Sequence, residues 1–175
     1  QAQHAERQRL RLVEDARARG LALASHDDTS AEHVCQAHEE GITISEFPTT
    51  VEAAETARRL GLKNVMGAPN VVKGGSHSGN VAAMTLAKMG LLDALSSDYV
   101  PASLLDAAFL LQDETSLSLP EAIRTVTSAP AEMVGLSDRG RIAQGLRADL
   151  VWVHRPSRGA GAGVRAAWRR GERVA

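Results

Sequence analysis

Polar and ionisable side chains gather at the ends of four short apolar segments. These ends read Ser25-His26-Asp27-Asp28, Ser45-Glu46-Phe47-Pro48, Met66-Gly67-Ala68-Pro69-Asn70 and Ser96-Ser97-Asp98-Tyr99. In parallel β/α folds the groups that bind ligands project from the carboxyl ends of the strands. An imidazole at one such end, with a carboxylate available at another, suits a divalent cation. We therefore predict His26 and Asp98 as metal ligands.

A glycine-rich segment follows the third apolar segment and reads Lys73-Gly-Gly-Ser-His-Ser-Gly-Asn80. Backbone N–H groups of a glycine-rich turn, together with the start of the helix predicted over 81–89, form a site for an anion. Lys73 adds a positive charge and the two serines add hydroxyl donors. The segment thus favours phosphate binding over an ordinary surface turn. The predicted substrate-binding residues are Asn70, Lys73, Gly75, Ser76, His77, Ser78 and Tyr99.

Several of the other candidates have an ordinary structural explanation. Asp28 is expected to cap a helix, since an acidic side chain is favoured at a helix N-terminus. Asp27 and Glu46 stay open: Glu46 is either a site carboxylate or a salt-bridge partner. Asp98 could cap the next helix, but Tyr99 and two further residues intervene. Cys35 lies in a helical stretch, where a small buried side chain is expected.

The elements that must position these residues follow a loose repeat. Gly20, Gly41, Gly61 and Gly90 each end a helical stretch, as expected of left-handed C-caps, and each precedes an apolar segment. Ser30 is expected to cap one helix, and Thr49 with Glu52 to form a capping box on the next. Strand, loop, helix and glycine at intervals of roughly 20–30 residues are typical of βα units with a parallel sheet.

The sequence pattern changes in the last part of the chain. After a helix over 101–111 and another from Leu119 to about Pro130, the sequence becomes punctuated by glycine, and 164–174 predicts a hairpin that turns at Arg170-Gly171. The predicted domains are a β/α unit over 1–135 and a small β module over 136–175. Four βα units do not close a barrel, which needs roughly 250 residues.

Composition excludes several functional classes. The net charge of −1 gives no basic field for nucleic acid or an anionic membrane, and the apolar runs are too short to span a bilayer. The 43% of apolar residues include few aromatics, so the core must be mainly Ala, Leu and Val. A single cysteine excludes an internal disulfide and fits the cytoplasm. A homo-oligomer is compatible with this composition.

The four strand-end motifs, with the long run from Met66 to Asn80, resemble in order and spacing the phosphonate-metabolism diphosphatases of the amidohydrolase superfamily. The segment 140–151 is similar to the return of such chains to their accessory β-sandwich. The resemblance implies an α/β fold, namely the C-terminal half of a TIM (β/α)8 barrel (strands five to eight) plus the C-terminal part of a small β-sandwich.

The resemblance also implies an activity: release of diphosphate from α-D-ribose 1-methylphosphonate 5-triphosphate, a phosphorylated ribose, in the carbon–phosphorus lyase pathway. His26 matches the strand-five metal ligand. Asp98 matches the strand-eight aspartate that binds the metal and takes a proton from the attacking water. The metal would be a divalent ion such as Zn, Mn or Fe.

Two departures from the family pattern are expected to matter. Where many amidohydrolases have a histidine on strand six, this chain offers Glu46, or else a ligand such as His77. The His-x-His of strand one and the bridging group of strand four would precede Gln1, so the chain alone is expected to be inactive. The alternatives are an amide hydrolase of the same superfamily, resembling a dihydroorotase or a deacetylase, and a non-enzymatic phosphate-binding α/β module.

Overall fold

Four short parallel strands form the centre of the computed structural model, which describes residues 2–76 and 79–175. They are β1 (Ala24–His26), β2 (Ile44–Glu46), β3 (Lys63–Gly67) and β4 (Ala94–Ser96), and they neighbour one another in chain order. The predicted parallel βα repeat is confirmed. Each strand begins one to three residues after the residue that follows the corresponding glycine.

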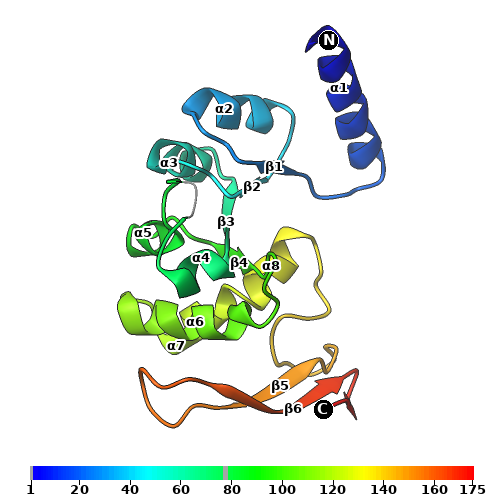
Figure 1. The fold of residues 1–175 in the computed structure, drawn as a ribbon. Coiled ribbons are helices and arrows are strands. Elements are labelled where there is room, and N and C mark those ends of the chain that lie inside the picture. Colours follow the sequence, from blue (N-terminus) through cyan, green and yellow to red (C-terminus); the bar gives the residue numbers. More distant parts are fainter. Residues whose placement is uncertain (1, 77–78) are drawn as a thin grey trace.

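Helices line one side of this sheet (Figure 1). The chain begins with α1 (Ala2–Ala18), and α2 (Ala31–Glu39), α3 (Val51–Arg59) and α5 (Ala83–Lys88) lie beside the strands. The four predicted glycine C-caps all have positive φ, between 64° and 85°. Ser30 caps α2 as predicted, whereas Thr50 rather than Thr49 caps α3, its hydroxyl accepting the Ala53 N–H at 3.1 Å.

Two helical segments differ from what the sequence predicted. A short helix, α4 (Ala68–Lys73), was not predicted; it follows β3 directly, and Pro69 suits its first turn. The helix predicted from Leu119 to about Pro130 is broken into α7 (Leu119–Arg124) and α8 (Ser128–Met133). Pro130 has no N–H to donate, so it fits the first turn of a new helix better than the interior of a long one. The preceding helix, α6, spans Ser103–Glu114.

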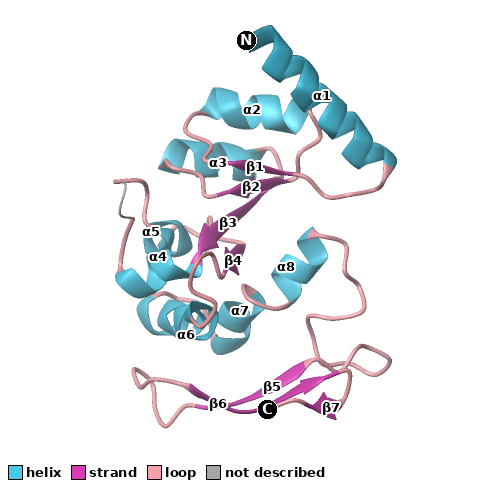
Figure 2. Cartoon of the chain, turned by 45° about the vertical axis from the view of Figure 1, so that its right-hand side comes forward, coloured by secondary structure: helices cyan, strands magenta, loops and turns pink. Residues whose placement is uncertain are grey.

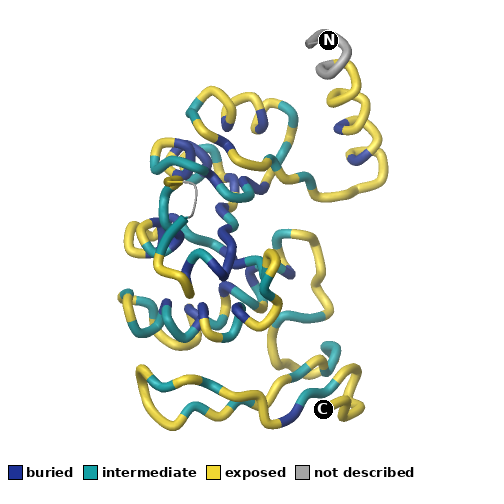
Figure 3. The backbone as a smooth tube through the Cα atoms, viewed as in Figure 1, coloured by how far each residue is buried: buried dark blue, intermediate teal, exposed yellow. Residues whose placement is uncertain are grey.

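The core lies between the sheet and these helices (Figure 3). Its buried hydrophobic side chains are mainly Ala, Leu and Val, as the composition predicts. Cys35 was predicted to be buried, and this is wrong. It is exposed on α2, whose buried positions are Val34 and Ala37. None of the helices in the described residues combines the length and apolar character that a bilayer-spanning segment requires.

Asn64 on β3 is fully buried and ties three elements together. Its amide nitrogen donates to the carbonyls of Ala54 on α3 and Leu91 before β4, both at 2.9 Å. We expect Asn64→Leu to destabilise the protein by about 2–4 kcal/mol, because two buried carbonyls lose their donors. The midpoint of urea unfolding measures this, and an unchanged midpoint would contradict it.

A second sheet forms from the end of the chain (Figure 2). Strands β5 (Leu150–His154), β6 (Gly163–Arg169) and β7 (Glu172–Arg173) are antiparallel and sequential. The predicted turn at Arg170-Gly171 is confirmed: both residues have positive φ, 53° and 84°, as a two-residue hairpin turn of this type requires.

Two arginines join this sheet to α6. The Asp113 carboxylate accepts hydrogen bonds from the Arg155 guanidinium and from the Gly159 N–H, and it lies 3.2 Å from Arg158 Nε. The Arg155 guanidinium also lies over the Phe109 ring, 4.6 Å from its centroid. The Asp113 carboxylate thus contributes three of the polar contacts between α6 and the second sheet.

Acid is expected to loosen this contact. The hydrogen bond from Arg155 is the largest of the effects that hold the pKa of Asp113 below its ordinary value. A depressed pKa in the folded state means that the contribution to stability is complete above the unfolded pKa, about 3.9, and is lost as pH falls through the folded pKa. The protection of the β5 and β6 amides against hydrogen exchange, relative to the intrinsic rate at each pH, should therefore fall only in acid. Asp113→Asn should exchange several-fold faster at neutral pH, and slow exchange in that variant would contradict the prediction.

Candidate active site

The carboxyl ends of the parallel strands carry three of the predicted site residues: His26, Glu46 and Asp98. Because the strands are parallel, these ends meet at one edge of the sheet. His26 and Glu46 are direct partners in the register of β1 and β2. Asp98 follows β4, with β2 and β3 between it and β1. The structure thus brings His26 beside Glu46 and leaves Asp98 across the sheet.

The His26 imidazole contacts two neighbouring residues at the edge of the sheet where the strands end, which we call the rim. Its Nδ1 lies 3.2 Å from Asp27 Oδ2, and its ring meets the Phe47 ring edge-on, with centroids 5.2 Å apart. Both His26 and Asp27 are more than half exposed. These contacts orient an imidazole that is still open to a ligand.

Backbone strain concentrates at the same rim. Asp27, Phe47 and Asp98 all have left-handed backbone conformations, with φ of 59°, 55° and 49°. Each such residue costs roughly 1–2 kcal/mol relative to an ordinary conformation, and strain of this kind clusters at functional sites. The conformation turns the chain sharply after β1, β2 and β4 and keeps these side chains at the strand ends.

Asp98 lies directly against Gly67, the last residue of β3. A Cβ atom at position 67 would come within 3.2 Å of Asp98 Oδ2. A larger residue at position 67 would have to displace the carboxylate. The absence of a side chain at Gly67 therefore leaves room for the Asp98 carboxylate.

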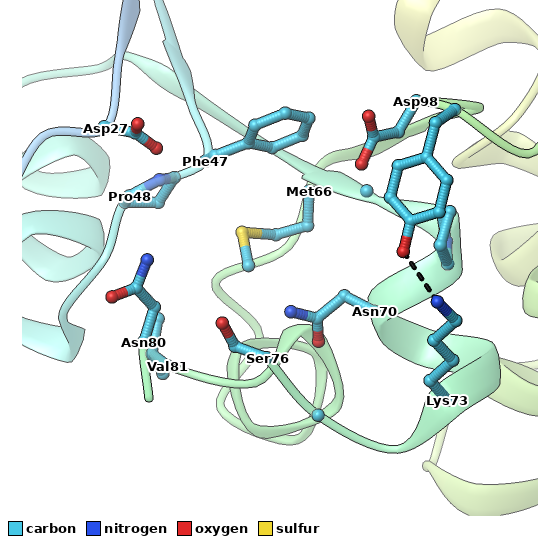
Figure 4. A pocket seen from close by; sticks show the side chains of 14 residues that line it. Asp27, Phe47, Pro48, Met66, Asn70, Lys73, Ser76, Asn80, Val81 and Asp98 are labelled. Carbon is cyan, nitrogen blue, oxygen red and sulfur yellow. Dashed lines mark hydrogen bonds between the residues drawn. The ribbon is translucent and has the colours of Figure 1, made fainter. Parts of the chain in front are cut away.

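A pocket of about 220 Å³ opens next to Asp98 (Figure 4). Several predicted residues line it, and so do some that were assigned no role. His26 and Glu46 are not among its lining residues, and His77 and Ser78 lie outside the described residues. The lining comprises Asp27, Phe47, Pro48, Met66, Gly67, Pro69, Asn70, Lys73, Gly75, Ser76, Asn80, Val81, Asp98 and Tyr99.

Helix α4, together with Tyr99 after β4, supplies the polar wall of the pocket. Lys73 Nζ lies 2.8 Å from Tyr99 Oη and 4.9 Å from the centre of the Tyr99 ring, so an ammonium and a phenol are presented together. Asn70 Oδ1 accepts the Ala83 N–H at 2.9 Å, and its amide nitrogen turns toward the pocket (Figure 4). This wall offers three donors suited to phosphate oxygens.

The opposite wall is apolar and was missed by sequence reasoning. Phe47, Pro48 and Met66 face the polar wall, and Asn80 and Val81 close the pocket beside them (Figure 4). The only signal was position, since these residues adjoin the strand-end motifs. Phe47 and Met66 otherwise have the character of core residues.

Asp28 does not cap a helix, contrary to expectation. Ser30 occupies the cap of α2, and the Asp28 side chain is turned inward and is 5% exposed. Its Oδ2 accepts hydrogen bonds from Ser25 Oγ and Ser45 Oγ, both at 2.6 Å. The carboxylate therefore lies beneath the rim.

The donor types at this edge fit a divalent cation, since imidazole and carboxylate are common ligands of Zn, Mn and Fe. Within residues 2–76 and 79–175, no three His, Cys, Asp or Glu side chains gather closely enough to hold a metal ion. The candidate ligands are His26 and Glu46 on adjacent strands and Asp98 after the far strand.

The sequence matches the Amidohydrolase family over residues 1–175. It is 56% identical over 160 residues to the alpha-D-ribose 1-methylphosphonate 5-triphosphate diphosphatase of Escherichia coli (strain K12). That match covers 90% of this chain and 42% of the relative, so the chain spans less than half of that protein.

Solved structures share the fold. A crystal structure of an uncharacterised protein has a TM-score of 0.72 at 21% identity, covering 94% of this chain and 48% of the other. The N-acetylglucosamine-6-phosphate deacetylase of Thermotoga maritima has a TM-score of 0.64 at 17% identity, covering 93% and 55%. Members of this superfamily are generally metal-dependent. Because the family match extends over the whole of this chain, the chain belongs to the amidohydrolase family.

Proposed function

We propose that this chain is part of a metal-dependent diphosphatase that hydrolyses α-D-ribose 1-methylphosphonate 5-triphosphate to the 5-phosphate and diphosphate in phosphonate catabolism. The observation that carries the proposal is the gathering of the strand-end motifs around one pocket, in a chain 56% identical to a diphosphatase of that name. We also propose a cytoplasmic setting, where the exposed Cys35 would stay reduced.

The architecture we propose is that of a barrel completed from elsewhere. Strands β1 to β4 would be strands five to eight of a (β/α)8 barrel, within a hydrolase domain over 1–135. Residues 136–175 would be the C-terminal part of a β-sandwich. We call this chain joined to the preceding barrel half the full-length protein. We expect activity only from the full-length protein.

His26 and Asp98 would hold the divalent ion, together with ligands from the preceding half. Glu46 would occupy the strand-six position, which is supported by its register beside His26. A divalent ion, when bound, makes water more acidic and withdraws electrons from a phosphoryl group. The Asp98 carboxylate would accept the proton of the attacking water.

The polar wall would hold the triphosphate. Lys73 Nζ and Tyr99 Oη form a paired donor, and the Asn70 amide nitrogen and Ser76 hydroxyl face the same space. Their donors would offset the charge that develops on the phosphate oxygens as the bond to the leaving group breaks. The apolar wall, which includes Phe47, would exclude water from the pocket.

Product analysis in water enriched in oxygen-18 tests the proposal. The full-length protein should release one diphosphate for each 5-phosphate, with the label in the 5-phosphate because water attacks the phosphorus next to the ribose. Phosphorus NMR resolves both products and the isotope shift. Release of orthophosphate, or turnover of cyclic or acetylated amides in place of the triphosphate, would contradict it.

A further inference from the structure

A buried carboxylate, Asp28, lies behind the strand ends and takes no part in the reaction proposed above. It is 5% exposed, and a single oxygen, Oδ2, accepts two hydrogen bonds of 2.6 Å. These are short bonds, as expected when the acceptor is charged. Burying a charge is unfavourable unless strong hydrogen bonds compensate, so its presence calls for a specific role.

The two donors, Ser25 and Ser45, are register partners on β1 and β2. Each directly precedes a candidate ligand, His26 or Glu46. Because side chains alternate along a strand, the serines face the helices while His26 and Glu46 share the other face. One carboxylate oxygen therefore bridges the two strands immediately behind this ligand pair.

The backbone around Asp28 strengthens the bridge. The Asp28 carbonyl accepts the Thr49 N–H at 2.9 Å and the Thr49 hydroxyl at 3.3 Å. On its other side, the Asp27 N–H donates to the Glu46 carbonyl at 3.0 Å. The loops that follow β1 and β2 are thus fastened to each other on both sides of the carboxylate.

We propose that Asp28 is a positioning residue that sets the spacing of the His26 imidazole and the Glu46 carboxylate for a divalent cation. The proposal rests on the metal site of the proposed function. Groups that orient metal ligands typically change metal affinity by 10–100-fold when removed. Asp28 does so through Ser25 and Ser45, without contacting the metal.

Metal affinity of the full-length protein is the direct test, measured with Zn²⁺ and Mn²⁺ by competition against a chromophoric chelator. Asp28→Ala should bind each ion about 10–100-fold more weakly, and its hydrolytic rate should recover at saturating metal. Asp28→Asn should stay near the parent affinity, because its oxygen can still accept from both serines. Ser45→Ala should weaken binding, and adding it to Asp28→Ala should change little further, since the two act as one unit.

Asn64→Ser is the matched control, because it removes a buried amide and its two hydrogen bonds from the helix-facing side of β3. It should lower stability and leave metal affinity unchanged. The proposal is overturned if folded Asp28→Ala binds metal like the parent, or if Asn64→Ser weakens binding equally. Should Asp28→Ala fail to fold, the Ser45→Ala affinity decides in the same way.

The outcomes separate this proposal from the proposed function. If the full-length protein binds metal with the expected dependence on Asp28 but releases no diphosphate, the substrate assignment fails and the positioning role is supported. If diphosphate is released and the Asp28 variants bind metal normally, only the positioning role fails. A full-length protein without affinity for either ion would overturn both.

Discussion

Asp98→Asn in the full-length protein is expected to lower the rate of diphosphate release by about 10³-fold. An asparagine fills the same space against Gly67 but has neither the negative charge nor the basicity to take a proton, and general base catalysis is typically worth 10²–10⁴-fold. The measurement is kcat at saturating substrate and metal.

Asp106→Asn is the matched control, since Asp106 is an exposed aspartate on α6 outside the pocket. It should keep the parent rate. Full activity in Asp98→Asn would remove the catalytic role that we assign to Asp98, and with it the main link between β4 and the reaction.

His26→Gln is expected to weaken metal affinity by about 100-fold or more, because a coordinating imidazole is replaced by a weaker ligand. Activity should fall in parallel and return only in part at high metal concentration. His38→Gln, on the exposed face of α2, is the matched control. Parent metal content in His26→Gln would show that the ion is held elsewhere.

Much of the fold could be predicted from local sequence. The glycines that end helices fix left-handed turns by themselves, and the Arg170-Gly171 turn needs only its own two residues and the flanking strands. Ser30 caps α2 through a bond to the N–H three residues away. Such features depend on neighbours in the chain, so the sequence expresses them directly.

What was missed depends on distant contacts. Asp28 has the sequence of a helix cap, but it is buried where Ser25 and Ser45, the latter 17 residues away, both donate to its carboxylate. The break between α7 and α8 places the Thr125 carbonyl where it accepts the Leu95 N–H of β4 at 2.9 Å. Cys35 follows the helical period only roughly, and its exposure was decided by which face of α2 meets α3.

The candidate site also has a part that was predictable from the sequence and a part that was not. The residue types at strand ends pointed to His26, Glu46 and Asp98, because a parallel sheet collects such ends at one edge, and the glycine-rich segment pointed to Lys73. The apolar wall around Phe47 and the register of His26 with Glu46 were not predictable, since they depend on how far each strand extends.

The left-handed conformation of Phe47 has a consequence for attempts to make this protein more heat-resistant. Glycine at position 47 would adopt that conformation without steric conflict, so screening for thermal tolerance alone should favour it. The same replacement would delete the ring that braces the His26 imidazole. Variants chosen only for survival at high temperature are therefore expected to drift toward poor catalysts.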